Sequence, residues 1–178
     1  MKVEYFDLKN KRVFITGGGS GIGASIVEHF CEQECEVYFV DINIKESKKL
    51  ISNLKKKKIK APHFIECNLL KIKKLENIIK KIIKSKGPID ILINNAANDD
   101  RHSTKQVDEK YWNNRMDVNL KHFFFTIKAV LKGMIQKKGG AIINLSSVSW
   151  MLGEGDKVAY ETAKSAVIGL TRSFAREF

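Results

Sequence analysis

The feature that most constrains the fold is a repeated alternation of short apolar runs with longer segments of helical periodicity. Runs rich in Val, Ile and Phe are typical of strands and occur at residues 12–16, 36–40, 62–66, 90–94 and 141–146. Apolar residues at helical spacing predict helices at residues 21–34, 45–57, 71–86, 108–137 and 157–177. Alternating strands and helices form βαβ units, whose right-handed crossovers place helices on both faces of a parallel sheet. The sequence therefore predicts an α/β fold with a doubly wound parallel sheet.

Length and composition indicate a single domain over residues 1–178. The chain is 43% hydrophobic, which is enough for one core, and no low-complexity linker divides it. No apolar run approaches the roughly 18 residues of a membrane span, so we expect a cytoplasmic protein that does not bind membranes. Three cysteines lack partners at metal-site spacing, and we interpret them as reduced thiols with no metal: Cys31, Cys35 and Cys67.

The net charge of +12 is concentrated in one stretch. Residues 45–86 hold 15 Lys and 3 Glu, whereas the other residues hold 17 basic and 17 acidic side chains, a balance of zero. Phe64 is the only Phe, Tyr or Trp of this stretch, although nucleic-acid grooves combine cations with stacking aromatic side chains. We therefore expect solvated Lys-rich helices and no nucleic-acid partner.

A glycine-rich run, "TGGGSGIGAS" at residues 16–25, joins the first strand to the first helix. Glycines at such a turn let the backbone approach a pyrophosphate, and the helix N-terminus offers free N–H groups. The strict dinucleotide-binding pattern fits only with Ala24 at its last position, and the looser pattern Gly17-x-x-x-Gly21-x-Gly23 is clearer. No Gly-Lys-Ser/Thr follows, which excludes a P-loop. The run predicts a nucleotide site.

Asp41 lies at the end of the second predicted strand, eighteen residues after Gly23. A carboxylate at this place accepts hydrogen bonds from an adenosine ribose diol and repels a 2′-phosphate. No Arg or Lys occupies the glycine run or directly follows Asp41. We therefore predict NAD rather than NADP as the cofactor; an Asp that caps the next helix is the alternative.

Tyr160 and Lys164 lie four residues apart in the last predicted helix and therefore share one of its faces. An unperturbed phenol is a poor base near neutrality, but a nearby ammonium group favours the phenolate, so Tyr160 becomes a usable acid or base. Ser147 ends the fifth strand, and the carboxyl ends of parallel strands line the ligand crevice. We expect Ser147 and the start of the last helix to meet there.

As a set in this order, the motifs resemble the short-chain dehydrogenase/reductase family. The matching positions are "TGGGSGIG" (16–23), Asp41, "NNAA" (94–97) in place of the usual Asn-Asn-Ala-Gly, Asn119, Ser147, Tyr160 and Lys164. The resemblance implies a Rossmann fold with strand order 3-2-1-4-5. It also implies that family members continue through two further strands beyond the position of Phe178. We therefore expect an incomplete chain that exposes its fifth strand and is destabilised and nearly inactive, but still binds the adenosine half of NAD.

The resemblance further implies a catalytic tetrad. Tyr160 would accept or donate the proton, Ser147 would hold the substrate oxygen, Lys164 would bind the nicotinamide ribose and favour the phenolate, and Asn119 would support a water in the proton relay. Cofactor contacts are expected from Gly17, Ser20, Gly21, Ile22, Gly23, Asp41, Asn68, Leu69, Asn95, Ala96, Tyr160 and Lys164. Asn68 stands where relatives usually have Asp, so we expect a weaker or altered adenine contact.

A narrower resemblance is to NAD-dependent sugar 1-dehydrogenases, which oxidise a cyclic aldose such as D-xylose to its lactone. It rests on "NNAANDDRH" (94–102), "VNLKHFFF" (118–125) and "SWMLGEGDKVAYETAKSA" (149–166). On this interpretation Trp150 would lie against a pyranose, and its hydroxyls would bond to Asn98, His102 or Glu154. The alternatives are that Trp150 is a core aromatic residue and His102 a loop histidine with its hydrogen bonds satisfied.

Other functions stay open from the sequence, one of which is an alcohol dehydrogenase of the same family that acts on a different substrate. A 3-oxoacyl thioester reductase would prefer NADPH and an acidic carrier protein, and Asp41 argues against it. A non-catalytic nucleotide-binding or nucleic-acid-binding module would not need Ser147, Tyr160 and Lys164 together. For the full-length enzyme the resemblance implies a small-molecule substrate and a homodimer or homotetramer built on the helices at 108–137 and 157–177.

Overall fold

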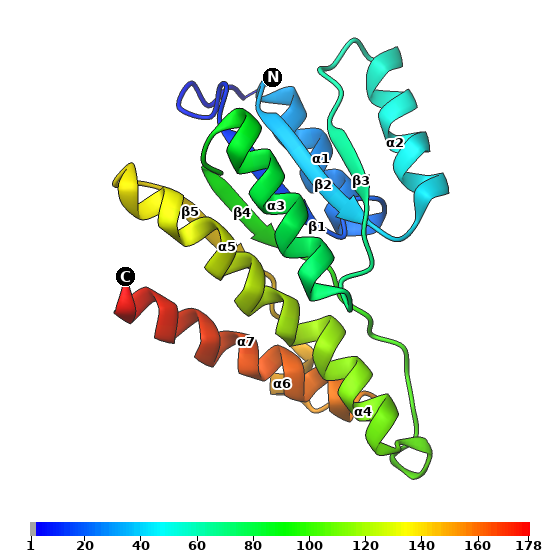
Figure 1. Ribbon diagram of the computed structural model, residues 1–178. Coiled ribbons are helices and arrows are strands. Elements are labelled where there is room, and N and C mark those ends of the chain that lie inside the picture. The colour runs from blue at the N-terminus through cyan, green and yellow to red at the C-terminus, as the bar shows by residue number, and fades with distance from the viewer. Residues whose placement is uncertain (1–2) are drawn as a thin grey trace.

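A computed structural model describes residues 3–178 as one parallel sheet flanked by helices. The strand order is β3-β2-β1-β4-β5, which confirms the expected doubly wound sheet. The strands are β1 (Arg12–Thr16), β2 (Glu36–Asp41), β3 (His63–Glu66), β4 (Ile91–Asn94) and β5 (Ala141–Asn144) (Figure 1). The fifth strand ends two residues earlier than predicted, and Ser146, beyond its end, donates a hydrogen bond to the carbonyl of Lys164 at 2.7 Å.

Helices of three to five turns follow each of the five strands. They are α1 (Gly21–Glu32), α2 (Ile44–Lys56), α3 (Ile72–Lys86), α5 (His122–Gln136) and α7 (Val158–Glu177). Shorter elements are η1 (Thr104–Gln106), α4 (Glu109–Met116), η2 (Asp117–Lys121) and α6 (Ser149–Leu152). The helix predicted over 108–137 is confirmed as a continuous helical segment from Glu109 to Gln136, in which the π-helical turn η2 joins α4 to α5. Such single π-helical turns inside α-helices are rare, and the helix prediction did not include one.

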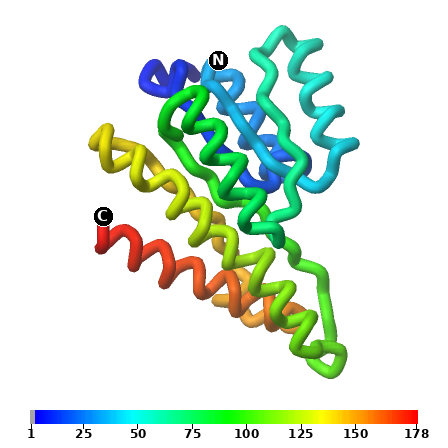
Figure 2. Tube along the Cα trace, viewed as in Figure 1, coloured from blue at the N-terminus to red at the C-terminus, as the bar shows by residue number. Residues whose placement is uncertain are grey.

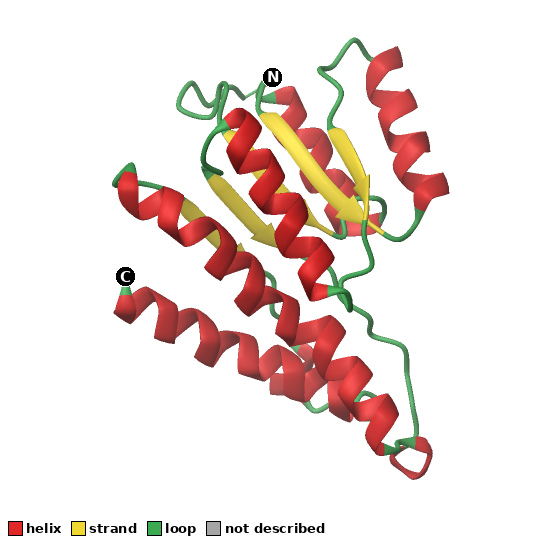
Figure 3. Ribbon diagram, viewed as in Figure 1, coloured by secondary structure: helices red, strands yellow, loops and turns green. Residues whose placement is uncertain are grey.

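The helices form one layer on each face of the sheet (Figure 3). On one face, α1 and α2 pack over β1 and β2 through a core that includes Val27, Leu54 and Phe39. On the other face, α3 and α5 pack against Phe14 and its neighbours, and α7 joins this layer beside α5. Both faces are thus covered over the central strands, which explains why their sequences are almost continuously apolar.

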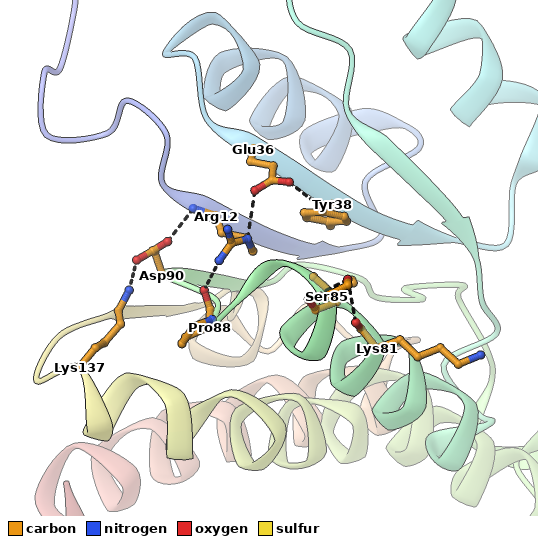
Figure 4. A network of polar contacts seen from close by, with 9 residues as sticks. Arg12, Glu36, Tyr38, Lys81, Ser85, Pro88, Asp90 and Lys137 are labelled. Atoms are coloured by element: carbon orange, nitrogen blue, oxygen red, sulfur yellow. Dashed lines mark hydrogen bonds and ion pairs between the residues drawn. The ribbon is translucent and has the colours of Figure 1, made fainter.

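A polar network joins the amino ends of the central strands (Figure 4). The Arg12 side chain donates from Nε to Glu36 at 3.1 Å and from Nη1 to the carbonyl of Pro88 at 2.8 Å. Its backbone N–H donates to Asp90 at 2.7 Å. Burial opposes the charge of Glu36, but hydrogen bonds from Tyr38 and Arg12 hold the pKa of Glu36 below its usual value. This network supports the strand register at the end of the sheet opposite Asp41.

The two helices of the Lys-rich stretch, α2 and α3, pack on opposite faces of the sheet. This division leaves each face with only part of the excess charge. From the end of β4 the chain runs away from the sheet, passes through η1 and turns back into α4 (Figure 2). Within residues 3–178, no helix is both long enough and apolar enough to cross a bilayer.

Candidate active site

A cleft of about 560 Å³ opens at the carboxyl ends of the strands, between the glycine run and the start of α7. All the residues predicted to contact the cofactor line it: Gly17, Ser20, Gly21, Ile22, Gly23, Asp41, Asn68, Leu69, Asn95, Ala96, Tyr160 and Lys164. The glycine run and the pair Tyr160 and Lys164 therefore line the same cleft. The lining also includes apolar residues that no motif predicted, among them Ile42 and Val118, although each is adjacent to a predicted polar site residue.

The glycine run has the close backbone packing that a pyrophosphate site requires. A Cβ at Gly23 would lie 1.8 Å from the carbonyl oxygen of Gly17, and Gly17 itself has a φ of +68°. Ser20 precedes α1 without a side-chain capping bond, so it does not occupy the free N–H groups of the first helical turn. These groups fit the phosphates of a dinucleotide.

Asp41 binds the glycine run from the end of β2. Its Oδ2 accepts a hydrogen bond from the backbone N–H of Gly19 and its Oδ1 accepts one from Asn43, both at 2.8 Å. A carboxylate oxygen can accept two hydrogen bonds, so each oxygen of Asp41 retains capacity for a ligand hydroxyl. Asp41 is thus able both to hold the loop and to accept hydrogen bonds from a ribose diol.

Thr16 connects the end of β1 with the segment after β4. Its Oγ1 accepts hydrogen bonds from the backbone N–H groups of Asn95 at 3.1 Å and Ala96 at 3.2 Å. The Asn95 side chain donates in return to the carbonyls of Thr16 and Gly17, at 3.1 and 2.9 Å. The fully buried ring of His122 lies 3.4 Å from the same hydroxyl. These contacts hold Ala96 against the glycine run.

Lys164 is 2% exposed and belongs to the lining of the cleft. Its Nζ donates to the carbonyl of Leu145 at 2.7 Å and lies 5.7 Å from the ring centroid of Tyr160. Burial lowers the pKa of Lys164 to about 8, against a smaller opposing effect of Asp99. The side chain therefore remains mostly cationic at neutral pH, and this charge lies on the face of α7 that carries Tyr160.

Ser147 and Asn119 lie next to the cleft but outside its lining. Ser147 Oγ is 2.8 Å from the hydroxyl of Ser149 and accepts the Ser149 N–H at 3.2 Å. Asn119, in the π-helical turn, is fully buried. Its amide accepts the N–H of Asn98 at 2.7 Å and donates to the carbonyl of the same residue at 3.0 Å. Asn119 thus fixes the loop that follows Ala97.

The residues predicted to contact a sugar are not all in one place. Asn98 lines the cleft, whereas Trp150, His102 and Glu154 lie outside its lining. Trp150 is half-buried in α6, and the exposed Glu154 forms an ion pair with Lys157 at 2.5 Å. His102 is 6% exposed, and its ring contacts other protein groups.

The sequence profile of the short chain dehydrogenase family matches residues 11–178, and the chain belongs to this family. Members of the family use a nicotinamide cofactor. The glycine loop and Asp41 fit such a group, and the Tyr160–Lys164 pair lies in the same cleft.

Among individual relatives, the chain is 45% identical over 173 residues to D-xylose 1-dehydrogenase of Caulobacter vibrioides, covering 97% of this chain and 68% of the relative. It is 40% identical over 172 residues to a probable galactose dehydrogenase of Rhizobium meliloti, covering 97% and 67%. The ligand-free aldohexose dehydrogenase of Thermoplasma acidophilum has a similar structure, with a TM-score of 0.85 and 29% identity over 98% of this chain and 64% of that one. The chain thus spans about two thirds of these relatives.

Proposed function

We propose that this protein is an NAD-dependent sugar dehydrogenase that oxidises the hemiacetal hydroxyl of an aldose such as D-xylose to the lactone. The observation that supports this most directly is the single cleft lined by the glycine run, Asp41, Tyr160 and Lys164. The named sugar dehydrogenases among the relatives support an aldose as the substrate class. Asp41 supports NAD over NADP, because a carboxylate accepts from a ribose diol and repels a 2′-phosphate.

The chemistry needs one group to move a proton while the cofactor, when bound, accepts the hydride. In the proposed mechanism the ammonium group of Lys164 favours the phenolate form of Tyr160, and this phenolate takes the hydroxyl proton of the substrate. Ser147 donates a hydrogen bond to the substrate oxygen, exchanging its present contact with Ser149. Asn119 supports the relay by holding the backbone of Asn98. The substrate loses one proton and one hydride, which converts the hemiacetal to a lactone.

Asn98 is the predicted sugar contact that also lines the cleft, and we propose that its amide bonds to a substrate hydroxyl. Trp150 and Glu154 belong to the segment between β5 and α7, which also contains Ser147. Their contact with a sugar stays a prediction, as do the cytoplasmic location and the homodimer or homotetramer.

The test is a panel of aldoses with NAD and with NADP, and a 3-oxoacyl thioester with NADPH. It uses the wild type and Tyr160→Phe, both extended through the two further strands that the family resemblance implies. We expect aldose-dependent formation of NADH and a loss of turnover of roughly a hundredfold or more in Tyr160→Phe. Tyr5→Phe is the matched control, because Tyr5 is exposed near the N-terminus and does not line the cleft. Retained turnover in Tyr160→Phe would remove the proposed base, and turnover of the thioester alone would replace the sugar as substrate.

A further inference from the structure

The imidazole of His102 contacts three other groups of the protein. Its Nδ1 lies 2.9 Å from the hydroxyl of Tyr111 and 3.2 Å from the carbonyl oxygen of Asp100. Its Nε2 lies 3.5 Å from the backbone nitrogen of Ala159, and the His102 backbone N–H donates to the carbonyl of Asp156 at 2.7 Å. One residue of the loop after β4 thus contacts both α4 and the amino end of α7.

The amino end of α7 has no cap of its own. Lys157 occupies the N-cap position without a side-chain capping bond, and its ammonium group instead contacts Glu154. The first N–H groups of a helix have no partner within the helix. Ala159 is fully buried, so solvent cannot supply an acceptor for its N–H. His102 Nε2 is the acceptor that the structure provides, at the residue directly before Tyr160.

This contact determines the tautomer of the imidazole. To accept from the Ala159 N–H, Nε2 must carry no proton, so the proton of the neutral ring lies on Nδ1. There it can be donated to the Asp100 carbonyl or the Tyr111 hydroxyl. The alternative tautomer would place two N–H groups opposite each other at Ala159.

Tyr111 in α4 contacts the imidazole directly, and Arg115 in the same helix contacts Tyr111. The Arg115 guanidinium lies 4.6 Å over the centroid of the Tyr111 ring, and its Nη2 donates to Asp100 at 3.1 Å. Arg115 is 9% exposed, whereas the Asp100 side chain is 68% exposed, so the guanidinium is sheltered from water but its ion pair is open to solvent on the Asp100 side. The tyrosine ring in turn packs against the ring of His102, with 4.9 Å between centroids.

We propose that His102 is a positioning residue that caps the amino end of α7 and thereby holds Tyr160 in the cleft. The inference rests on the proposed function of Tyr160 as the base. It links the loop that carries Asn98 to the helix that carries Tyr160, so that the two walls of the cleft keep one relative position. His102 then contributes to turnover without touching substrate or cofactor.

The test compares His102→Leu, which removes the acceptor, with His102→Gln, whose amide oxygen can replace Nε2. His63→Leu is the matched control, because His63 is exposed on β3 at the far edge of the sheet. Two quantities are measured: the backbone amide hydrogen exchange of residues 158–161, and kcat and KM with an aldose and NAD. We expect His102→Leu to speed this exchange roughly fivefold or more, as loss of a cap does.

In the same variant we expect kcat to fall roughly tenfold or more with KM for NAD unchanged, because the base is displaced and the adenosine site is not. His102→Gln should restore most of both quantities, and His63→Leu should match the wild type. If His102→Leu does not fold, Tyr111→Phe is used instead, because it removes one hydrogen-bond partner of His102 Nδ1. It should change the exchange rate and kcat in the same directions, but less.

Unchanged exchange at residues 158–161 would overturn the capping role. Faster exchange with unchanged kcat would overturn the link to Tyr160. A raised KM for the aldose alone, with normal exchange, would make His102 a substrate contact instead. If the wild type extended through the family's two further strands oxidises no aldose, the proposed function fails, while the exchange measurement still decides whether His102 caps α7.

Discussion

Among single residues, Lys164 combines a charge with almost complete burial. Its pKa is about 8 in the folded protein and 10.5 when unperturbed. Because the folded state binds this proton more weakly, the cost to stability is fully present below pH 8 and disappears as the pH rises to 10.5. We expect Lys164→Met to raise the free energy of unfolding at pH 7 by about 1–3 kcal/mol, while turnover is lost.

Urea unfolding of wild type and Lys164→Met at pH 7 and pH 10 measures this cost. The difference between the two proteins should shrink at the higher pH. Lys128→Met, at an exposed position of α5, is the control and should show no such change with pH. A Lys164→Met protein that is less stable than the wild type at pH 7 would contradict the prediction.

Asp41 is expected to set the cofactor preference. Asn in its place keeps one acceptor oxygen, loses the negative charge and replaces the other oxygen with a donor. We expect Asp41→Asn to weaken NADH binding roughly tenfold and to weaken NADPH binding much less, because repulsion of the 2′-phosphate is removed. Dissociation constants from nucleotide fluorescence measure both. Glu66→Gln, at the β3 position paired with Asp41, is the control, and an unchanged NADH-to-NADPH ratio in Asp41→Asn would exclude the proposed role.

Among the elements, two helical glycines differ in the space available for a side chain. A Cβ at Gly23 would lie 1.8 Å from the carbonyl oxygen of Gly17, whereas a Cβ at Gly169 in α7 would have nothing within 4 Å. We expect Gly23→Ala to destabilise the fold by at least about 2 kcal/mol and to abolish nucleotide binding. Gly169→Ala should stabilise it by about 0.5–1 kcal/mol with binding unchanged. Thermal unfolding with and without NADH tests both, and equal effects of the two substitutions would refute the distinction.

At the scale of the whole molecule, β5 is an edge strand of the described sheet. Its Ile143 is 47% exposed, and such apolar edges promote pairing between molecules. We expect Ile143→Lys to reduce concentration-dependent self-association, as measured by light scattering, without a change in NADH affinity. Ile135→Lys, at an exposed apolar position on α5, is the control for added charge alone. Equal suppression by both substitutions would argue against pairing through the strand edge.

Prediction from the sequence was most accurate where local chemistry decides the structure. The five strands, the glycine run and the shared face of Tyr160 and Lys164 follow from apolar runs, backbone freedom and helical periodicity. It was least accurate where packing interrupts a local pattern. The helix expected over 108–137 contains a π-helical turn at Asn119, and the short helix α6 was not predicted.

The sequence by itself determined the order of strands and helices, the nucleotide loop and the family of the protein, because each depends on neighbouring residues in a recognisable pattern. Only the tertiary structure decided which distant groups meet. The amide of Asn119 holds Asn98, the hydroxyl of Ser147 contacts Ser149, and the imidazole of His102 reaches Ala159. The physical reason is that buried polar groups take the partners that packing brings within hydrogen-bonding distance, and no local pattern specifies those partners.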